Sequence, residues 1–271
     1  MSHPHDIPVR YSDHDPRFFE DRDQFTRTAA ETVAPLVLAL YPVRSVIDLG
    51  CGVGTWLSVF IRHGVEEIRG IEGQAVDSQL LQIPVSSFEQ HDLTQPLMVD
   101  RTYDLAISLE VAEHLPPDSS ADFVKTLVGL APVVLFSAAI PNQGGISHIN
   151  ERPATYWSQQ FARHNYVTID AIRRRIWNRD DIKAWYRQNI LLFAHQDMLD
   201  KIPSMQAALE QTRQDQLNLV HPQTLQWRID EYKQRVQKAR EIYLGDLARM
   251  LPGMVRRAIA VRGRRLLGKD G

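Results

Sequence analysis

Glycines at three alternate positions, directly after a short apolar segment, constrain the fold of this chain more than any other feature. The segment is Val46-Ile47-Asp48-Leu49, and the glycines are Gly50, Gly52 and Gly54. Because glycine has no Cβ, such a loop lets the backbone pass very close to a ligand. A helical pattern begins directly after the loop. The order of strand, glycine loop and helix therefore predicts a ligand site at the end of a buried strand.

The dinucleotide-binding fingerprint G-x-G-x-x-G also places glycines between a strand and a helix. Its third glycine would fall at position 55, where this chain has Thr55. The pattern D-x-G-x-G-x-G, which starts at Asp48, instead resembles motif I of the class I S-adenosylmethionine-dependent methyltransferases. The resemblance implies that Gly50, Gly52 and Gly54 bind S-adenosylmethionine and that Asp48 orients the loop near its methionine part. Trp56 would pack on the cofactor or fill the helix–sheet interface.

Strand-like and helix-like segments alternate over most of the chain. The expected strands are 46–49, 67–71, 86–91, 103–109 and 132–140, and the expected helices are 21–40, 54–63, 74–81, 119–130 and 153–164. This alternation predicts an α/β fold with a mostly parallel sheet and helices on both faces. Ligands bind such sheets beyond the carboxyl ends of the strands. The resemblance implies that the β-rich runs 166–172 and 189–194 complete a seven-stranded, Rossmann-like sheet with an antiparallel final strand.

Three parts of the chain are expected. Residues 1–29 form an N-terminal segment with the start of the first helix, residues 30–195 the methyltransferase domain, and residues 196–271 a helical appendage. Apolar residues recur every three or four positions from about 222 to 250, which indicates an amphipathic helix. This helix would pack on the domain or pair with a second subunit in a homodimer. The tail 253–267 mixes arginines with apolar residues, which suits an anionic membrane surface, a solvated tail or, third, nucleic acid.

Composition narrows the partners and the compartment. The net charge of −2 gives no overall bias toward nucleic acid. Cys51 is the single cysteine, so no intramolecular disulfide can form, which fits a reducing compartment. The first residues lack a secretory signal, and no apolar run approaches the roughly 20 residues that cross a bilayer. We expect a cytoplasmic protein, and contact of its tail with the inner face of a membrane is the alternative to a solvated tail.

Two acidic residues at strand ends are further candidates for the cofactor site. Glu72 follows the second expected strand, and a carboxylate there can accept hydrogen bonds from both hydroxyls of a ribose. Asp92 follows the third, where the resemblance implies a contact with the adenine amino group. The competing interpretation is that both acids cap the elements that follow.

Ionisable side chains cluster after the fourth expected strand, at Glu110, Glu113 and His114. Burying that much charge is costly unless it is paired or coordinates a cation. Carboxylates and an imidazole suit Mg²⁺ or Mn²⁺. His148 lies on the loop after the fifth strand, at the same end of the sheet.

The pattern E-x-x-E-H with a later histidine resembles the catechol O-methyltransferases of quinone biosynthesis and the small-RNA 3′-terminal 2′-O-methyltransferases. There these residues hold a divalent cation that binds neighbouring substrate hydroxyls. Carried over, the ligands would be Glu110, Glu113, His114 and His148. Many metal-free methyltransferases also read L-E-V-x-E-H here, so His114 or His148 would alternatively be a general base, or the group has no catalytic role.

The sequence patterns that indicate the class of methyl acceptor are weaker than those that indicate the cofactor. The stretches 148–151, 156–157 and 185–190 resemble bacterial methyltransferases found with glycan and cell-surface assembly enzymes. The arginines at 173–175 would face a phosphate or solvent. We expect an O-methyltransferase acting on a hydroxyl of a sugar or glycan intermediate, as a small molecule or linked to a lipid. The alternatives are a catechol-like small molecule, an RNA 3′ end, a nitrogen acceptor, or a non-catalytic cofactor-binding scaffold.

Overall fold

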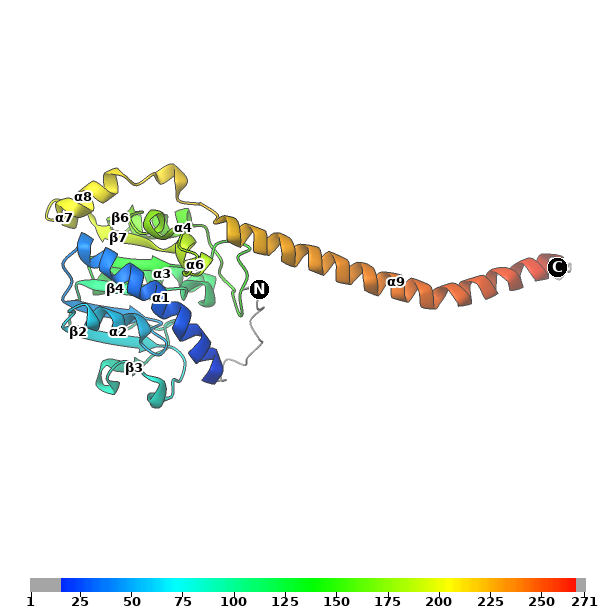
Figure 1. The fold of residues 1–271 in the computed structure, drawn as a ribbon, viewed down its shortest axis with the longest axis horizontal. Helices are drawn as coiled ribbons and strands as arrows, with labels where there is room; N and C mark the ends of the chain where they lie inside the picture. Colours follow the sequence, from blue (N-terminus) through cyan, green and yellow to red (C-terminus); the bar gives the residue numbers. More distant parts are fainter. Residues whose placement is uncertain (1–15, 267–271) are drawn as a thin grey trace. The chain divides into compact units, whose positions relative to one another are not determined.

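The computed structural model describes residues 16–266 of the 271-residue chain (Figure 1). Contacts divide the chain into a first unit that extends to His221 and a second that begins at Pro222. The second unit contains one long helix, α9 (Pro222–Leu266). No helix in the described part of the chain is long and apolar enough to cross a membrane.

A seven-stranded sheet forms the centre of the first unit, with the strand order β3-β2-β1-β4-β5-β7-β6. Its strands are β1 (Ser45–Leu49), β2 (Glu67–Glu72), β3 (Phe88–Gln90), β4 (Leu105–Leu109), β5 (Val133–Ser137), β6 (Tyr166–Ile169) and β7 (Leu191–His195). Only β7 runs antiparallel to its neighbours among these strands. The predicted seven-stranded Rossmann-like sheet with an antiparallel final strand is therefore confirmed.

Helices cover both faces because side chains of the central strands alternate between two apolar cores. Leu105 and Ile107 of β4 face one core, and Ala106 faces the other. The first core takes residues from α1 (Pro16–Leu40), α2 (Thr55–Arg62), α5 (Arg173–Ile176), α6 (Ala184–Asn189), α7 (Gln196–Leu199) and α8 (Pro203–Glu210). The second takes residues from α3 (Ser120–Leu130) and α4 (Ala154–Ala162).

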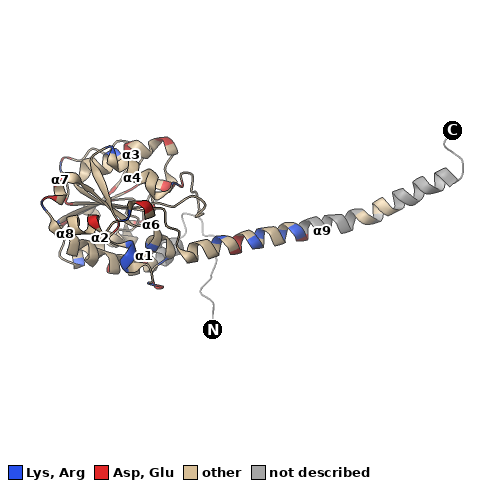
Figure 2. Ribbon diagram, turned by 90° about the horizontal axis from the view of Figure 1, so that it is seen from above, with Lys and Arg blue, Asp and Glu red and all other residues tan. Residues whose placement is uncertain are grey.

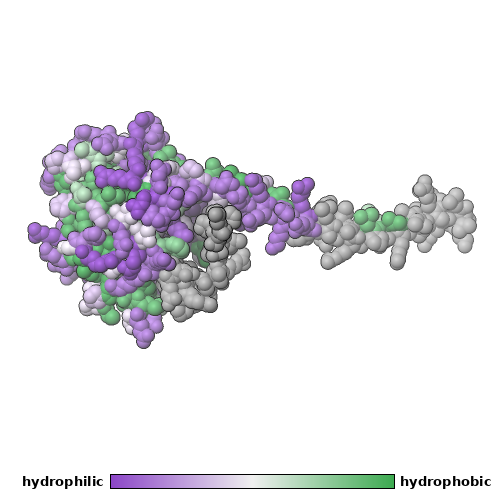
Figure 3. Space-filling model, viewed as in Figure 1, coloured by the Kyte–Doolittle hydropathy of each residue, from purple (hydrophilic) through white to green (hydrophobic). Residues whose placement is uncertain are grey.

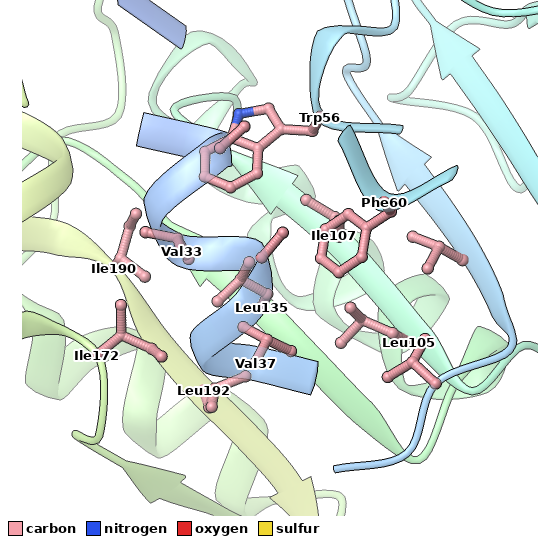
Figure 4. Packing of buried hydrophobic residues seen from close by; sticks show 14 of the residues in the cluster. Val33, Val37, Trp56, Phe60, Leu105, Ile107, Leu135, Ile172, Ile190 and Leu192 are labelled. Atoms are coloured by element: carbon pink, nitrogen blue, oxygen red, sulfur yellow. The ribbon is translucent and has the colours of Figure 1, made fainter. Parts of the chain in front are cut away.

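Helix α1 packs lengthwise on the first core, where Val33 and Val37 lie over Leu135 and Leu192 (Figure 4). Trp56 in the first turn of α2 is buried in the same core, with its ring edge-on to Tyr186 at 5.9 Å. Trp56 thus fills the interface between helix and sheet, which is one of its two expected roles. The close packing of α1 and α2 fixes the helix that follows the glycine loop.

Two helix predictions need correction. The first helix begins at Pro16 rather than at residue 21, because proline suits the first helical position, where its missing N–H has no partner anyway. The predicted helix 74–81 is wrong, since only the 3-10 turn η1 (Ser78–Leu80) forms there. Asp77 has an extended backbone, and its carboxylate accepts a hydrogen bond from Gln79 N at 2.9 Å. That local bond replaces the helical one.

Candidate functional site

The loops that follow β1, β4 and β5 meet at one edge of the sheet. The strands are parallel neighbours, with Asp48 of β1 opposite Ile107 of β4, and Leu109 of β4 opposite Ser137 of β5. The glycine loop, the segment 110–114 and the loop that carries His148 therefore leave the sheet side by side, as the parallel topology predicts.

The three glycines of the loop all have positive φ, at +86° for Gly50, +55° for Gly52 and +85° for Gly54. A Cβ on Gly50 would lie 2.3 Å from Val111 Cγ2, and one on Gly54 would lie 2.8 Å from Ile83 Cγ1. A Cβ on Gly52 would meet no atom of the described residues within 4 Å. The first and third glycines are thus required by packing inside the protein, whereas Gly52 faces open space that a cofactor could fill.

Glu72 ends β2 beside this loop, where its carboxylate bonds to the loop backbone. Its Oε2 accepts a hydrogen bond from Gly52 N at 2.8 Å, and its Oε1 accepts one from Gln74 N at 3.0 Å. Each oxygen retains a lone pair, so the carboxylate can still accept hydrogen bonds from a diol. Glu72 therefore lies beside the glycine loop, and its contact with a ribose stays a prediction.

Asp92 lies in the exposed turn after β3, close to Glu72 along the sheet edge, because His91 N donates to Glu72 O at 2.9 Å. Its Oδ1 accepts hydrogen bonds from Thr94 N at 2.9 Å and Thr94 Oγ1 at 2.7 Å. The backbone hydrogen bond is the main reason why the pKa of Asp92 is lowered. This carboxylate caps its own turn, and its contact with adenine stays a prediction.

Asp48 is almost completely buried within β1. Burial, with a smaller contribution from the charge of Glu72, raises its pKa well above the usual value. A buried carboxylate next to the loop is suited to a cationic group on the ligand, because such a group would stabilise its charged form.

Replacing Asp48 with asparagine should change how stability depends on pH. A carboxyl with a higher pKa in the folded state takes up a proton on folding, so stability falls as the pH rises from about 4 through the folded pKa. We therefore expect the Tm of Asp48→Asn relative to wild type to increase over that range. Thermal unfolding as a function of pH measures this, with exposed Asp118→Asn as the control. A Tm difference that does not vary with pH would contradict it.

Glu113, His114 and His148 form a group of three potential metal ligands, whose ligand atoms all lie within 4.8 Å of one another. Glu113 is completely buried, and neither carboxylate oxygen has a hydrogen-bond partner among the described residues. Burial, followed by the charge of Glu110, raises its pKa. The two histidine rings stand edge to face, 4.9 Å apart. A buried carboxylate without partners is costly, so this site suits a cation.

Backbone hydrogen bonds bring His148 to the 112–114 turn. Ile149 N and Asn150 N both donate to Glu113 O, at 2.9 and 3.0 Å. The Asn150 side chain also donates to Ala112 O at 3.2 Å and to Ser120 Oγ at 2.9 Å. The chain from 148 to 150 is thereby fixed against the turn that carries Glu113 and His114.

Glu151 fixes the ring of His148, a role that the sequence analysis missed. Its Oε1 lies 3.1 Å from His148 Nδ1 and also accepts a hydrogen bond from Gly144 N at 2.7 Å. Carboxylates commonly orient histidine ligands of metals in this way. The signal in the sequence was an acid three residues after the histidine, within the polar stretch 148–151.

Glu110 is not part of the group of three, although it was expected as a fourth ligand. It has a positive φ of +57°, which is rare outside glycine and concentrates at functional sites. Its carboxylate accepts hydrogen bonds from Asn189 Nδ2 at 3.1 Å and from Gln143 Nε2 at 3.2 Å. The two amides hold the carboxylate at the same sheet edge, and sequence reasoning did not identify either of them.

The arginines at 173–175 do not act as one cluster. Arg173 is buried and forms a two-pronged ion pair with Asp170, at 3.0 and 2.6 Å, and it donates to Leu217 O at 2.8 Å. The expectation that it faces phosphate or solvent is wrong, because its donors hold the β6–α5 turn to the segment around 217. Arg174 and Arg175 are exposed.

Aromatic rings lie on the side of the glycine loop that α1 and α6 cover. Asp23 accepts a hydrogen bond from Thr55 Oγ1 at 2.6 Å, which fixes this part of α1 to the start of α2. Lys183 Nζ lies 3.5 Å from the centroid of the Phe25 ring and 6.0 Å from that of Trp185. Both rings are more than a third exposed, so they are accessible to a ligand.

Comparison with known proteins identifies the family. The methyltransferase-domain family matches residues 19–185. Two solved structures have a similar fold. One is the sugar N-methyltransferase KedS8 from Streptoalloteichus sp, with 14% identity and a TM-score of 0.53 over 72% of this chain and 99% of that one. The other is the S-adenosylmethionine-bound amino pentose methyltransferase CalS10 from Micromonospora echinaspora, with 12% identity and a TM-score of 0.50 over 71% of this chain and 100% of that one. No curated protein matches the chain. At these identities the structural likeness concerns the fold, and with the family match it shows that the chain belongs to the class I S-adenosylmethionine-dependent methyltransferases.

Proposed function

We propose that this methyltransferase methylates a hydroxyl of a sugar or glycan intermediate, with the help of Mg²⁺ or Mn²⁺. The observation that carries the proposal is the buried carboxylate of Glu113, which has no hydrogen-bond partner among the described residues and lies with His114 and His148. This group is next to the cofactor loop, because Gly50 packs directly against Val111. A cation site beside a methyl donor suits an acceptor with neighbouring hydroxyls.

The chain's own residues would divide the work. Glu113, His114 and His148 would hold the cation, which lowers the pKa of a coordinated hydroxyl and fixes its position. Glu110, held by the amides of Asn189 and Gln143, would accept a hydrogen bond from the acceptor hydroxyl. S-adenosylmethionine supplies an electrophilic methyl group on its sulfonium. Orientation of the hydroxyl toward that group accounts for much of the expected acceleration.

The metal-free alternative is also supported by a specific observation. The contact between Glu151 Oε1 and His148 Nδ1 is the arrangement that orients a histidine acting as a general base. In that case His148 would take the proton of the acceptor hydroxyl itself, and His114 would be the second candidate base.

A sugar acceptor is favoured by the half-exposed rings of Phe25 and Trp185 and by the Lys183 ammonium between them. Flat aromatic faces suit the apolar faces of sugar rings, and an ammonium suits a phosphate substituent. The two similar structures are described as sugar and amino pentose methyltransferases, so a sugar nitrogen competes with a hydroxyl. A lipid-linked glycan would place the enzyme in the cytoplasm at a membrane. The arginine side chains of the tail, which would contact that membrane, lie outside the described residues.

The proposal is tested by S-adenosylhomocysteine formation with a panel of acceptors and added Mn²⁺. The panel contains nucleotide-linked and free hexoses, amino sugars, catechol and a short RNA with a free 3′ end. We expect product formation with hexoses. Mass spectrometry and NMR should locate the transferred methyl group on a hydroxyl oxygen of the sugar. Turnover confined to catechol, RNA or the amino group of an amino sugar would contradict it.

Replacing Trp185 by alanine should raise the KM for a hexose acceptor while leaving S-adenosylhomocysteine affinity unchanged. Loss of one stacking face should cost about 1 kcal/mol, which corresponds to roughly a fivefold rise in KM. Initial-rate kinetics and calorimetry measure the two quantities. Trp227→Ala, at an exposed tryptophan of α9, is the matched control. An unchanged acceptor KM in Trp185→Ala would exclude the ring from the acceptor site.

A further inference from the structure

We propose that the first part of α9, residues 225–240, lies on an anionic lipid bilayer, with one apolar face in the interfacial region. The face, called here the apolar stripe, is made of Leu225, Ile229, Tyr232, Val236 and Ala239. All five residues are exposed, so within the second unit nothing that the structure describes covers them. Leaving a row of large apolar side chains in water is unfavourable, so the stripe calls for an occupant.

The spacing of the stripe keeps it on one side of the helix. Its members follow one another at intervals of four, three, four and three residues. Because an α-helix completes a turn in about 3.6 residues, these positions fall within a narrow sector along the axis. Figure 3 shows hydrophobic atoms along one edge of this part of α9, beside hydrophilic ones.

The charges around the stripe are sorted by sign. Helical geometry places Arg228 and Arg235 along one border of the stripe and Lys233 and Arg240 along the other. All four border positions are basic. Figure 2 shows both signs of charge along the length of this part of α9. Basic and acidic residues are therefore separated around the helix rather than along it.

The acidic residues of the segment occupy the opposite side. Asp230 and Glu231, and Glu241 directly after the segment, lie on the half of the helix away from the stripe. Glu231 pairs with Arg228 and Arg235 of one border, and Asp230 Oδ1 lies 3.9 Å from Nζ of Lys233 on the other border. Within residues 225–240 five basic residues outnumber two acidic ones, and four of the five border the stripe, so the segment keeps a net positive charge beside the surface that would meet its partner.

This arrangement favours a bilayer over a second copy of the helix. When two copies pair through an apolar seam, the residues that border the seam face each other, and here four basic residues would oppose four others. At a bilayer the same residues meet lipid phosphates, while their long apolar stems run along the acyl region and their charged ends reach the headgroups. A tyrosine such as Tyr232 suits the same depth, since its ring is apolar and its hydroxyl polar.

The proposal is independent of the acceptor and of the cation site. The experiment is co-sedimentation of the full chain with vesicles of phosphatidylcholine alone or of about equal parts phosphatidylcholine and phosphatidylglycerol. Binding to the anionic vesicles that weakens at high salt is expected. The double variant Ile229→Glu/Val236→Glu should bind them about a hundredfold less, because it removes apolar burial and adds negative charge.

The matched control is Trp227→Glu, which changes an exposed aromatic residue on the side of α9 away from the stripe. This variant is expected to keep most of the binding. Unchanged affinity for S-adenosylhomocysteine would show that the first unit is folded in each variant. Circular dichroism would show that α9 is still helical. If the double variant still binds anionic vesicles, the proposal is overturned, and the contact with the membrane belongs to the basic tail. Light scattering reports the oligomeric state. If the wild-type protein is a dimer that does not bind vesicles, and the double variant is a monomer, the proposal is overturned in favour of a second copy of the chain.

Discussion

Replacing Gly52 by alanine is expected to lower S-adenosylhomocysteine affinity by about a hundredfold while destabilising the free protein by only about 1 kcal/mol. The alanine must adopt a φ near +55°, which accounts for the small loss of stability. Its Cβ meets no atom of the described residues within 4 Å, so it would enter the space above the loop that we expect the cofactor to occupy. Calorimetric titration and thermal unfolding of the same sample measure the two effects separately.

Two other glycines provide the controls. Gly64 also has a positive φ, of +93°, and open space at its Cβ, but it lies in the turn between α2 and β2. Gly64→Ala should therefore lose similar stability and keep its affinity. Gly50→Ala should lose both, because its Cβ would collide with Val111. Wild-type affinity in Gly52→Ala would show that the cofactor does not approach this glycine, and would contradict our assignment of the loop.

Replacing His148 by alanine should abolish cation binding and lower kcat/KM for methyl transfer about a thousandfold. Affinity for S-adenosylhomocysteine should be unchanged, since His148 lies on the loop after β5 and not on the glycine loop. Titration of the EDTA-stripped protein with Mn²⁺, in the presence of S-adenosylhomocysteine, measures the first effect. Glu113→Gln should behave in the same way, because it removes the buried charge of the group.

Glu151→Gln separates the orienting residue from the ligands. Loss of the carboxylate beside His148 Nδ1 should weaken Mn²⁺ about 10- to 100-fold without abolishing binding. His63→Ala, at an exposed histidine outside the site, is the control. If wild-type protein binds no Mn²⁺ while His148→Ala still loses transfer, the cation hypothesis is wrong and His148 is a general base. Full transfer in His148→Ala would remove this residue from both mechanisms.

The cofactor half of the site could be predicted from the sequence because its signals are local. A strand, three glycines and a helix are neighbours in the chain, and their backbone requirements restrict which residues can occupy them. The positive φ values of Gly50, Gly52 and Gly54 agree with that interpretation. The parallel sheet could be predicted for the same reason, because the alternation of strands and helices is also a local pattern in the sequence. Where a local hydrogen bond competed, at Asp77, the helix prediction over 74–81 was wrong.

The acceptor half depended on contacts between residues far apart in the chain. Gln143 and Asn189 hold Glu110 although they lie 33 and 79 residues from it in the chain, so no local pattern connects them with that carboxylate. Whether a buried charge is paired is likewise a tertiary property: Arg173 has Asp170 as its partner, whereas Glu113 has none among the described residues. The sequence by itself predicted the fold, the position of the glycine loop at the end of β1 and the residue types of the candidate cation group. Only the tertiary structure decided that Glu113, His114 and His148 converge while two amides hold the Glu110 carboxylate beside Glu113, because hydrogen bonds from distant loops place these side chains.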